Sequence, residues 1–113
     1  MRMKEKPIEN EVLNFLKGCG FFFWKMDRQG TFDPVRKTFR ANKNPHKIKG
    51  VADILGIIEG RMVAIEVKSP TGRLTDEQRI FLTKVNENGG VAFCTRSAMQ
   101  TANELVKIGR AHV

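Results

Sequence analysis

Two apolar runs joined by a short turn dominate the middle of the chain, between Gly50 and Lys68. The residues between the runs, Glu59 and Gly60, suit a two-residue hairpin loop because glycine readily adopts a positive φ. Each run is apolar at consecutive positions, which is typical of strands buried on both faces. This pattern predicts an antiparallel pair at the centre of a sheet, around which the other elements must pack.

Three charged residues interrupt this apolar hairpin, and the predicted register brings them together. With Glu59 and Gly60 as the loop, Asp53 lies opposite Glu66, and Lys68 lies two residues farther on the same face. Directly opposed residues on one face have Cβ atoms about 5 Å apart. If the loop is shifted by one residue, Asp53 faces Lys68 with Glu66 diagonal to it. The three groups therefore converge in either register.

The paired acids Asp53 and Glu66 need a counter-charge. Side by side in an apolar setting, two carboxylates repel each other and lose hydration. A divalent cation between them would relieve both effects, since carboxylate oxygens are ligands that Mg²⁺ and Mn²⁺ prefer, and the backbone carbonyl of Val67 could add another oxygen. The alternative is a salt-bridge cluster at a sheet edge. The hairpin thus predicts either a metal site or an ion-pair network.

Composition narrows the class of protein. Of the 113 residues, 41% are hydrophobic and 28% are charged, which excludes a disordered or fibrous chain. A chain of this length is predicted to form one domain, residues 1–113, in which fold and function share one sheet. The formal net charge of +8 favours a polyanionic partner, most simply nucleic acid. Charge alone leaves open a basic protein without enzymatic activity.

The cysteines and the apolar runs bear on the compartment. Cys19 and Cys94 lack the number and spacing of a disulfide framework or a zinc site, and we interpret both as small core residues in a reducing compartment. No apolar run reaches the roughly 20 residues that span a bilayer, and the N-terminus lacks the apolar core of a signal peptide. We therefore expect a cytoplasmic protein with no membrane partner.

Helical and strand patterns predict the elements before the hairpin. A first helix is predicted from Pro7 to about Lys17. Its inward-facing residues are Ile8, Val12, Phe15 and Leu16. An aromatic strand follows from Phe21 to Met26, predicted to be central because it is apolar without alternation. Trp24 is predicted to lie in the core rather than to stack on bases.

Capping patterns predict the elements after the hairpin. Thr75 and Gln78 form a capping box that opens a second helix, which ends at Asn88. A buried strand is predicted over residues 91–95, and Ser97 with Gln100 opens a final helix. The inward residues of the two helices are predicted to be Phe81, Leu82 and Val85, and Ala102, Leu105 and Val106. This α-β-β-β-α-β-α order predicts an α/β fold with a mixed central sheet flanked by helices.

A basic segment at about residues 25–49 resembles an insertion before the Asp53 strand. It has no clear period, so we expect a long irregular or weakly stranded segment. Its cations, together with Arg73, are candidates for binding nucleic-acid phosphates, and Phe32 or Phe39 could stack on bases. These cations are Lys25, Arg28, Arg36, Lys37, Arg40, Lys43, Lys47 and Lys49. The alternative is a solvated loop that keeps the protein soluble.

The spacing of Asp53 and Glu66-Val67-Lys68 resembles the PD-(D/E)xK nuclease signature, in which an Asp and a Glu-x-Lys lie on adjacent strands of a restriction-endonuclease-like core. The surrounding segments sharpen the resemblance toward the VRR-NUC branch, the virus-type replication-repair nucleases. These segments are residues 50–54, 65–68, 72–78 and 89–92. Ala52 departs from the family's Pro-Asp dipeptide, which affects backbone stiffness rather than a ligand. The resemblance covers about residues 5–108.

The resemblance implies further site residues. Family members carry a glutamate on the first helix, which Glu9 matches best and Glu5 less well, and a second-helix glutamine that corresponds to Gln78. The implied catalytic residues are Asp53, Glu66, Lys68, Glu9 and Gln78, and the implied ligands of Mg²⁺ or Mn²⁺ are Asp53, Glu66, Glu9 and the Val67 carbonyl. Small stand-alone members imply a homodimer that acts on branched DNA, such as four-way junctions or flaps, in DNA repair in a bacterial or phage-infected cell.

We interpret the chain as a metal-dependent DNA nuclease that hydrolyses phosphodiester bonds, with structure-selective endonuclease activity implied by the resemblance. Lys68 would position or deprotonate the attacking water, or stabilise the phosphate, and these roles stay open. Two rival hypotheses are a non-catalytic nucleic-acid-binding module of the same fold and a structural basic protein of a nucleoprotein assembly. The intact Asp53, Glu66 and Lys68 argue against the binding module.

Overall fold

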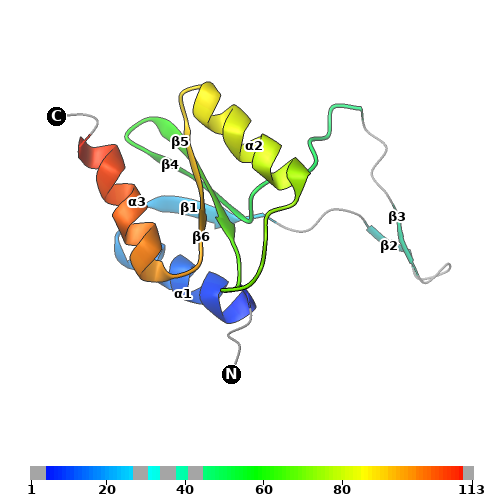
Figure 1. Cartoon of the computed structure of the whole chain (residues 1–113), viewed down its shortest axis with the longest axis horizontal. Coiled ribbons are helices and arrows are strands. Elements are labelled where there is room, and N and C mark those ends of the chain that lie inside the picture. The colour runs from blue at the N-terminus through cyan, green and yellow to red at the C-terminus, as the bar shows by residue number, and fades with distance from the viewer. Residues whose placement is uncertain (1–4, 27–30, 34–37, 41–44, 111–113) are drawn as a thin grey trace.

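A computed structural model describes residues 5–26, 31–33, 38–40 and 45–110. In this part of the chain, three helices pack against a four-stranded sheet of order β1-β4-β5-β6 (Figure 1). The elements are α1 (Glu5–Gly18), β1 (Phe22–Lys25), β2 (Thr31–Asp33), β3 (Thr38–Arg40), β4 (Ile54–Ile58), β5 (Arg61–Val67), α2 (Asp76–Glu87), β6 (Val91–Thr95) and α3 (Ala98–Arg110). The predicted α/β class and the mixed sheet are confirmed.

The central hairpin has the first of the two predicted registers. Ile58 pairs with Arg61 and Ile54 with Ile65, so one further step back places Asp53 opposite Glu66. The loop residues have positive φ, 53° at Glu59 and 75° at Gly60. This combination belongs to the type I′ turn, whose twist matches that of the flanking strands. β4 and β5 lie at the centre of the sheet, as their unbroken apolar runs predicted.

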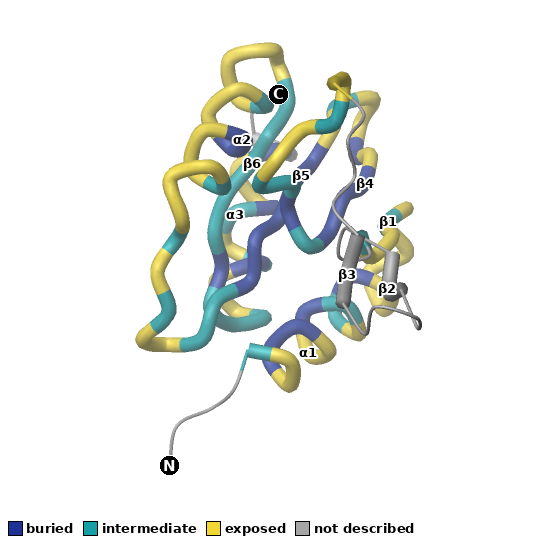
Figure 2. Tube along the Cα trace, turned by 90° about the vertical axis from the view of Figure 1, so that its right-hand side faces the viewer, coloured by how far each residue is buried: buried dark blue, intermediate teal, exposed yellow. Residues whose placement is uncertain are grey.

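Helices cover both faces of the sheet, each with its own apolar cluster. α1 and α3 pack on one face and α2 on the other (Figure 1). Buried residues of the first cluster include Ile8, Val12, Leu16, Ile54, Ile65, Leu105 and Ile108, and those of the second are Ala52, Leu55, Ala64, Phe81 and Leu82. Figure 2 shows the buried positions concentrated along β4 and β5. The central hairpin therefore holds the two layers together.

The predicted central position of the aromatic strand is wrong. β1 is an edge strand, paired antiparallel with β4 alone. Phe22 is 66% exposed and Trp24 is 38% exposed, so Trp24 is not a core residue. The physical reason is that α2 packs over β5 and β6 and does not lie over β1. An apolar sequence shows which residues a strand contains, but it does not show whether a helix covers that strand.

Three further expectations about burial need correction. Cys19 is exposed and Cys94 is only partly buried. Val106 on α3 is exposed, because the inward stripe of that helix runs through Thr101, Leu105 and Ile108 at helical spacing. The strand over residues 91–95 lies at the other edge of the sheet, parallel to β5, and is only partly buried except at its last residue.

The capping residues predicted from the sequence lie at the starts of α2 and α3. The Thr75 hydroxyl accepts a hydrogen bond from the Gln78 N–H, and the Gln78 side chain accepts one from the Thr75 N–H, which confirms the capping box of α2. At α3 the Ser97 hydroxyl accepts from the Gln100 N–H as predicted, but the Gln100 side chain accepts from the Arg96 N–H, one residue before the expected donor. No helix in the described ranges is long and apolar enough to cross a bilayer.

The basic segment contains a second, two-stranded sheet. β2 and β3 pair antiparallel, with Phe32 opposite Phe39. This agrees with the expectation of a weakly stranded segment. Only the backbone of these two strands belongs to the described structure, so the proposed base-stacking role of Phe32 and Phe39 stays a prediction.

Candidate active site

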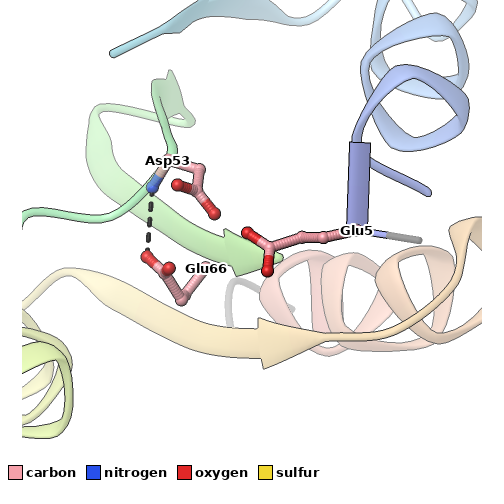
Figure 3. A group of neighbouring side chains, drawn as sticks. All are labelled: Glu5, Asp53 and Glu66. Carbon is pink, nitrogen blue, oxygen red and sulfur yellow. Dashed lines mark hydrogen bonds between the residues drawn. The ribbon is translucent and has the colours of Figure 1, made fainter. Parts of the chain in front are cut away.

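Asp53 and Glu66 are tied to each other's strands by backbone hydrogen bonds. The Asp53 N–H donates to Glu66 Oε2 at 3.2 Å, as the dashed line in Figure 3 shows. In return, the Val67 N–H donates to Asp53 Oδ2 at 3.0 Å. Asp53 directly precedes β4 and Glu66 is the penultimate residue of β5, so the two bonds cross between neighbouring strand ends. The hairpin register therefore fixes the spacing of the two acids.

Glu66 is a buried acid with an altered pKa. Its residue is 1% exposed, and its Oε1 lies 3.7 Å from the Lys68 ammonium nitrogen and accepts a hydrogen bond from the Gln78 amide at 3.0 Å. Burial and the adjacent negative charge of Asp53 raise the pKa of Glu66 from its ordinary 4.5 to about 8, and the positive charge of Lys68 opposes them. This carboxyl therefore favours a bound proton or a bound cation near neutral pH.

Gln78 joins a helix cap to the site. Its side-chain oxygen accepts from the Thr75 N–H while its amide nitrogen donates to Glu66 Oε1. One side chain thus uses its acceptor for the start of α2 and its donor for the acid on β5. The residue was predicted for both places, once by the capping pattern and once by the family resemblance.

The acid that α1 brings to this pair is Glu5. Carboxylate oxygens of Glu5, Asp53 and Glu66 all lie within 4.8 Å of one another, and Figure 3 shows the Glu5 side chain pointing toward the other two. Glu9, which the sequence favours for this place, is buried and forms an ion pair with Lys25 at 3.5 Å. The two glutamates are one helical turn apart on the same face of α1.

The Val67 carbonyl faces the same side of β5 as Asp53. The Lys68 N–H donates to the Thr95 carbonyl on β6. A trans peptide points its N–H and its C=O in opposite directions, so the carbonyl of Val67 points away from β6 and toward the Asp53 side. This is the direction that its predicted role as a further oxygen donor requires.

These groups line an open cleft of about 520 Å³. Its lining residues are Glu5, Met26, Gly50, Val51, Ala52, Asp53, Glu66, Lys68, Thr75 and Gln78. The cleft lies where the ends of β1, β4 and β5 meet the first turns of α1 and α2. All described candidate catalytic residues except Glu9 line it.

Two residues that support this cleft escaped the sequence reasoning. Gly50 has φ +76°, and a Cβ atom there would lie 2.6 Å from the backbone nitrogen of Gln78, so only glycine fits between the Asp53 strand and α2. The Arg96 guanidinium donates to the carbonyls of Ser69 and Gly72, the latter at 2.7 Å, and holds the loop that follows Lys68. Gly50 appeared only as part of a motif, and nothing in the sequence marks Arg96.

The predicted phosphate-binding cations divide into described and undescribed residues. Lys49 and Arg73 are exposed, Lys47 is half-buried, and the Lys25 side chain is 47% exposed while paired with Glu9. Arg28, Arg36, Lys37 and Lys43 lie outside the described residues, as does the side chain of Arg40. Their role in binding DNA therefore stays a prediction.

The donor set of the cleft suits a hard divalent cation. Three carboxylates and a backbone carbonyl offer oxygen atoms only, which Mg²⁺ and Mn²⁺ prefer over the nitrogen and sulfur donors that suit zinc. Burial first, and then the charge of Asp53, raise the pKa of Glu66, and a bound cation would oppose both effects because its positive charge stabilises the ionised carboxylates. The residues present therefore fit such an ion.

Comparison with known proteins agrees with this chemistry. The family model of the VRR-NUC domain matches residues 31–99, more than half of the chain. Asp53, Glu66, Lys68 and Gln78 lie inside the matched range, whereas α1 with Glu5 lies before it. Searches of curated proteins and of solved structures gave no match. VRR-NUC domains are nucleases that generally depend on divalent metal ions, with DNA as the implied substrate. The chain belongs to the VRR-NUC family of nucleases.

Proposed function

We propose that this nuclease is a Mg²⁺- or Mn²⁺-dependent endonuclease that hydrolyses phosphodiester bonds of branched DNA. The observation that carries the proposal is the group of three carboxylates from Glu5, Asp53 and Glu66, with oxygen atoms within 4.8 Å of one another, beside the Lys68 ammonium in an open cleft. The net charge of +8 supports a polyanionic substrate.

Asp53, Glu66, Glu5 and the Val67 carbonyl would hold the cation. When bound, the cation supplies charge neutralisation at the scissile phosphate and lowers the pKa of a water molecule. Glu9, one turn from Glu5, would act from outside this group, either through a water molecule or by orienting Lys25. This assignment gives Glu5 the place that the family resemblance suggested for Glu9.

The chain's own residues prepare the site for hydrolysis. The N–H of Val67 and the amide of Gln78 hold the carboxylates of Asp53 and Glu66 in fixed orientations, so the acids need no rearrangement. Lys68 is mostly buried, with its ammonium 3.7 Å from Glu66, and it is the only described lining residue of the cleft with a positive charge. It would orient or deprotonate the attacking water, or stabilise the phosphate oxygens as charge develops.

Exposed cations around the cleft would bind the flanking phosphates. Arg73 lies on the loop that follows Lys68, and Lys49 immediately precedes Gly50 at the rim. Binding through such contacts weakens steeply as salt increases. Preference for four-way junctions or flaps, and assembly as a homodimer, are proposed on the resemblance to small stand-alone VRR-NUC nucleases.

The test compares the wild type with Glu66→Ala and Lys68→Ala on labelled four-way junction, flap, linear duplex and single-stranded DNA, each with Mg²⁺, Mn²⁺ or EDTA. We expect metal-dependent cutting that both variants lose, with the junction or the flap cut fastest. Glu87→Gln, an exposed carboxylate at the far end of α2, is the matched control. Tight, salt-sensitive binding without cutting in any metal would instead identify a non-catalytic binding module.

A further inference from the structure

Alternate residues of β1 form a stripe that leads into the cleft. Phe22 is paired with Ile57 and Trp24 with Leu55, and Leu55 belongs to the apolar cluster on the α2 side of the sheet. Met26, two residues farther, packs against that same cluster and lines the cleft. Its N–H donates to the Asp53 carbonyl at 2.8 Å. Phe22, Trp24 and Met26 therefore share one face with the metal-binding acids.

The two aromatic residues of this stripe are exposed and touch each other. Phe22 is 66% exposed and Trp24 is 38% exposed, and their ring centroids are 5.4 Å apart at an interplanar angle of 49°. In the described part of the chain, α2 does not lie over β1 (Figure 1). Two neighbouring aromatic rings thus present their surfaces to solvent beside the active site.

We propose that Phe22 and Trp24 form a stacking platform for unpaired DNA bases next to the active site. Aromatic side chains stack on every base, because each base has a π face, and this makes such contacts tolerant of sequence. The platform selects DNA with splayed or single-stranded bases, whose faces are free, over continuous duplex. The inference rests on the proposed function, since the metal-binding acids define where the scissile phosphate lies.

The spacing suits a DNA strand that passes over this face. Along β4, Leu55 is two residues from Asp53 and Ile57 is four, or about 7 Å and 13 Å at the rise of a strand. Trp24 and Phe22 are the cross-strand neighbours of those two positions. With about 3.4 Å between stacked nucleotides, the platform lies roughly two to four nucleotides from the scissile phosphate.

The charge of the chain favours DNA as the occupant of this face. The chain carries a net charge of +8, which attracts a polyanion. Lys25, which follows Trp24, lies on the opposite face of β1 and pairs with Glu9 there, so the attraction rests on the net charge of the chain. Aromatic rings, rather than aliphatic side chains, occupy both exposed positions of β1 on this face.

The fluorescence of Trp24 provides a direct test, because the chain has one tryptophan and no tyrosine. The intact protein is titrated in EDTA with a single-stranded oligonucleotide, a duplex with splayed ends and a blunt duplex. We expect saturable quenching by the first two and none by the blunt duplex. Phe22→Ala is expected to weaken binding of single-stranded and splayed DNA on the order of tenfold, and Phe22→Trp to restore it.

Ile57→Ala is the matched control, since Ile57 lies opposite Phe22 on the same face, is 48% exposed and has no ring. Its affinity for single-stranded DNA should equal that of the wild type. Equal quenching by blunt duplex, or no quenching by any DNA, would overturn the proposal. So would sedimentation data in which Phe22→Ala and Ile57→Ala both convert a dimer to a monomer, because the patch would then be an interface between copies.

The two proposals can fail separately. A wild-type protein that cuts no DNA in any metal, yet shows quenching by single-stranded DNA, would lose the endonuclease assignment and keep the platform. A protein that cuts DNA in Mn²⁺ but shows no change in Trp24 fluorescence would keep the nuclease and lose the platform.

Discussion

The two ends of the α2-side face of the sheet invert the usual distribution of polar and apolar groups. At one end, which holds Asp53, Glu66 and Lys68 and is called the charged end below, the carboxylate of Glu66 is buried, with 1% of the residue exposed. The other end, called the aromatic end below, is formed by Phe22, Trp24 and Ile57. Here Phe22 is 66% exposed and Ile57 is 48% exposed. Polar groups are normally exposed and large apolar groups buried, so both ends cost folding free energy.

The two ends differ in how that cost is met. At the charged end, hydrogen bonds from Val67 and Gln78 and the ammonium of Lys68 compensate the acids, and no buried side-chain N or O atom in the described residues lacks a partner. At the aromatic end, α2 does not extend over the rings, and both keep a substantial exposed surface. The chain's own groups thus compensate the charges at the first end, whereas the exposed rings at the second end are available to a binding partner. Such departures from local rules are expected at functional sites.

The largest expected effect tests which acid of α1 belongs to the charged end. Glu5→Gln should lower the rate of metal-dependent cleavage by more than about 100-fold, since residues that only support metal ligands typically cost 10- to 100-fold. Glu9→Gln should cost no more than the roughly 10- to 100-fold typical of a supporting residue, because its carboxylate pairs with Lys25 outside the group of three. Single-turnover cleavage rates in Mn²⁺ measure both, and Glu11→Gln, an exposed acid of the same helix, is the control. If Glu9→Gln loses more of the cleavage rate than Glu5→Gln does, Glu9 is the metal ligand in place of Glu5.

The next effect concerns the backbone that holds the charged end in place. Gly50→Ala should destabilise the protein by about 2–5 kcal/mol, because the methyl group overlaps the backbone of Gln78 and the φ is positive. Gly89→Ala is the matched control: its φ is +92° but nothing lies within 4 Å of the added Cβ, so only the conformational strain of about 1–2 kcal/mol applies. Urea unfolding curves compare the two variants. Equal losses would show that the contact between Gly50 and α2 is not tight.

Much of the charged end could be predicted from sequence because local rules determine it. The positive φ of the Glu59 and Gly60 turn fixed the register, and the register paired Asp53 with Glu66. The same holds for the start of α2, where Thr75 and Gln78 bond to each other three residues apart. These features depend on neighbours along the chain or on a single hairpin.

The rest depends on contacts between elements far apart in sequence. Which glutamate of α1 reaches the site follows from how that helix docks, and both residues lie on one face, so periodicity cannot separate Glu5 from Glu9. The exposure of Trp24 follows from where α2 lies, which the composition of β1 does not encode. The role of Arg96, which bonds carbonyls more than twenty residues away, leaves no local pattern.

A smaller effect measures what burial of Glu66 costs. Its pKa is about 8 in the folded protein and near 4.5 when unfolded, so between these values the folded state binds a proton that the unfolded state does not. In EDTA, this group's contribution to stability should fall as pH rises from about 5 to 8 and then level off. Thermal unfolding across this range measures it. Glu66→Gln should remove this component, and Mn²⁺ at pH 8 should restore stability to the wild type alone. If the stability of the wild type and that of Glu66→Gln depend on pH in the same way, the raised pKa of Glu66 is contradicted.

The smallest effect belongs to the aromatic end and compares two isoleucines of β4. Ile54→Val removes a methyl group from a fully buried side chain and should cost about 1 kcal/mol. Ile57→Val removes the same group from a side chain that is 48% exposed and should cost less than about 0.5 kcal/mol. Chemical denaturation at several protein concentrations measures both. If the cost for Ile57 equals that for Ile54, or grows with protein concentration, the exposed patch is covered in solution by another copy. A negligible and concentration-independent cost would show that this end of the sheet contributes little to folding and is free to bind a partner.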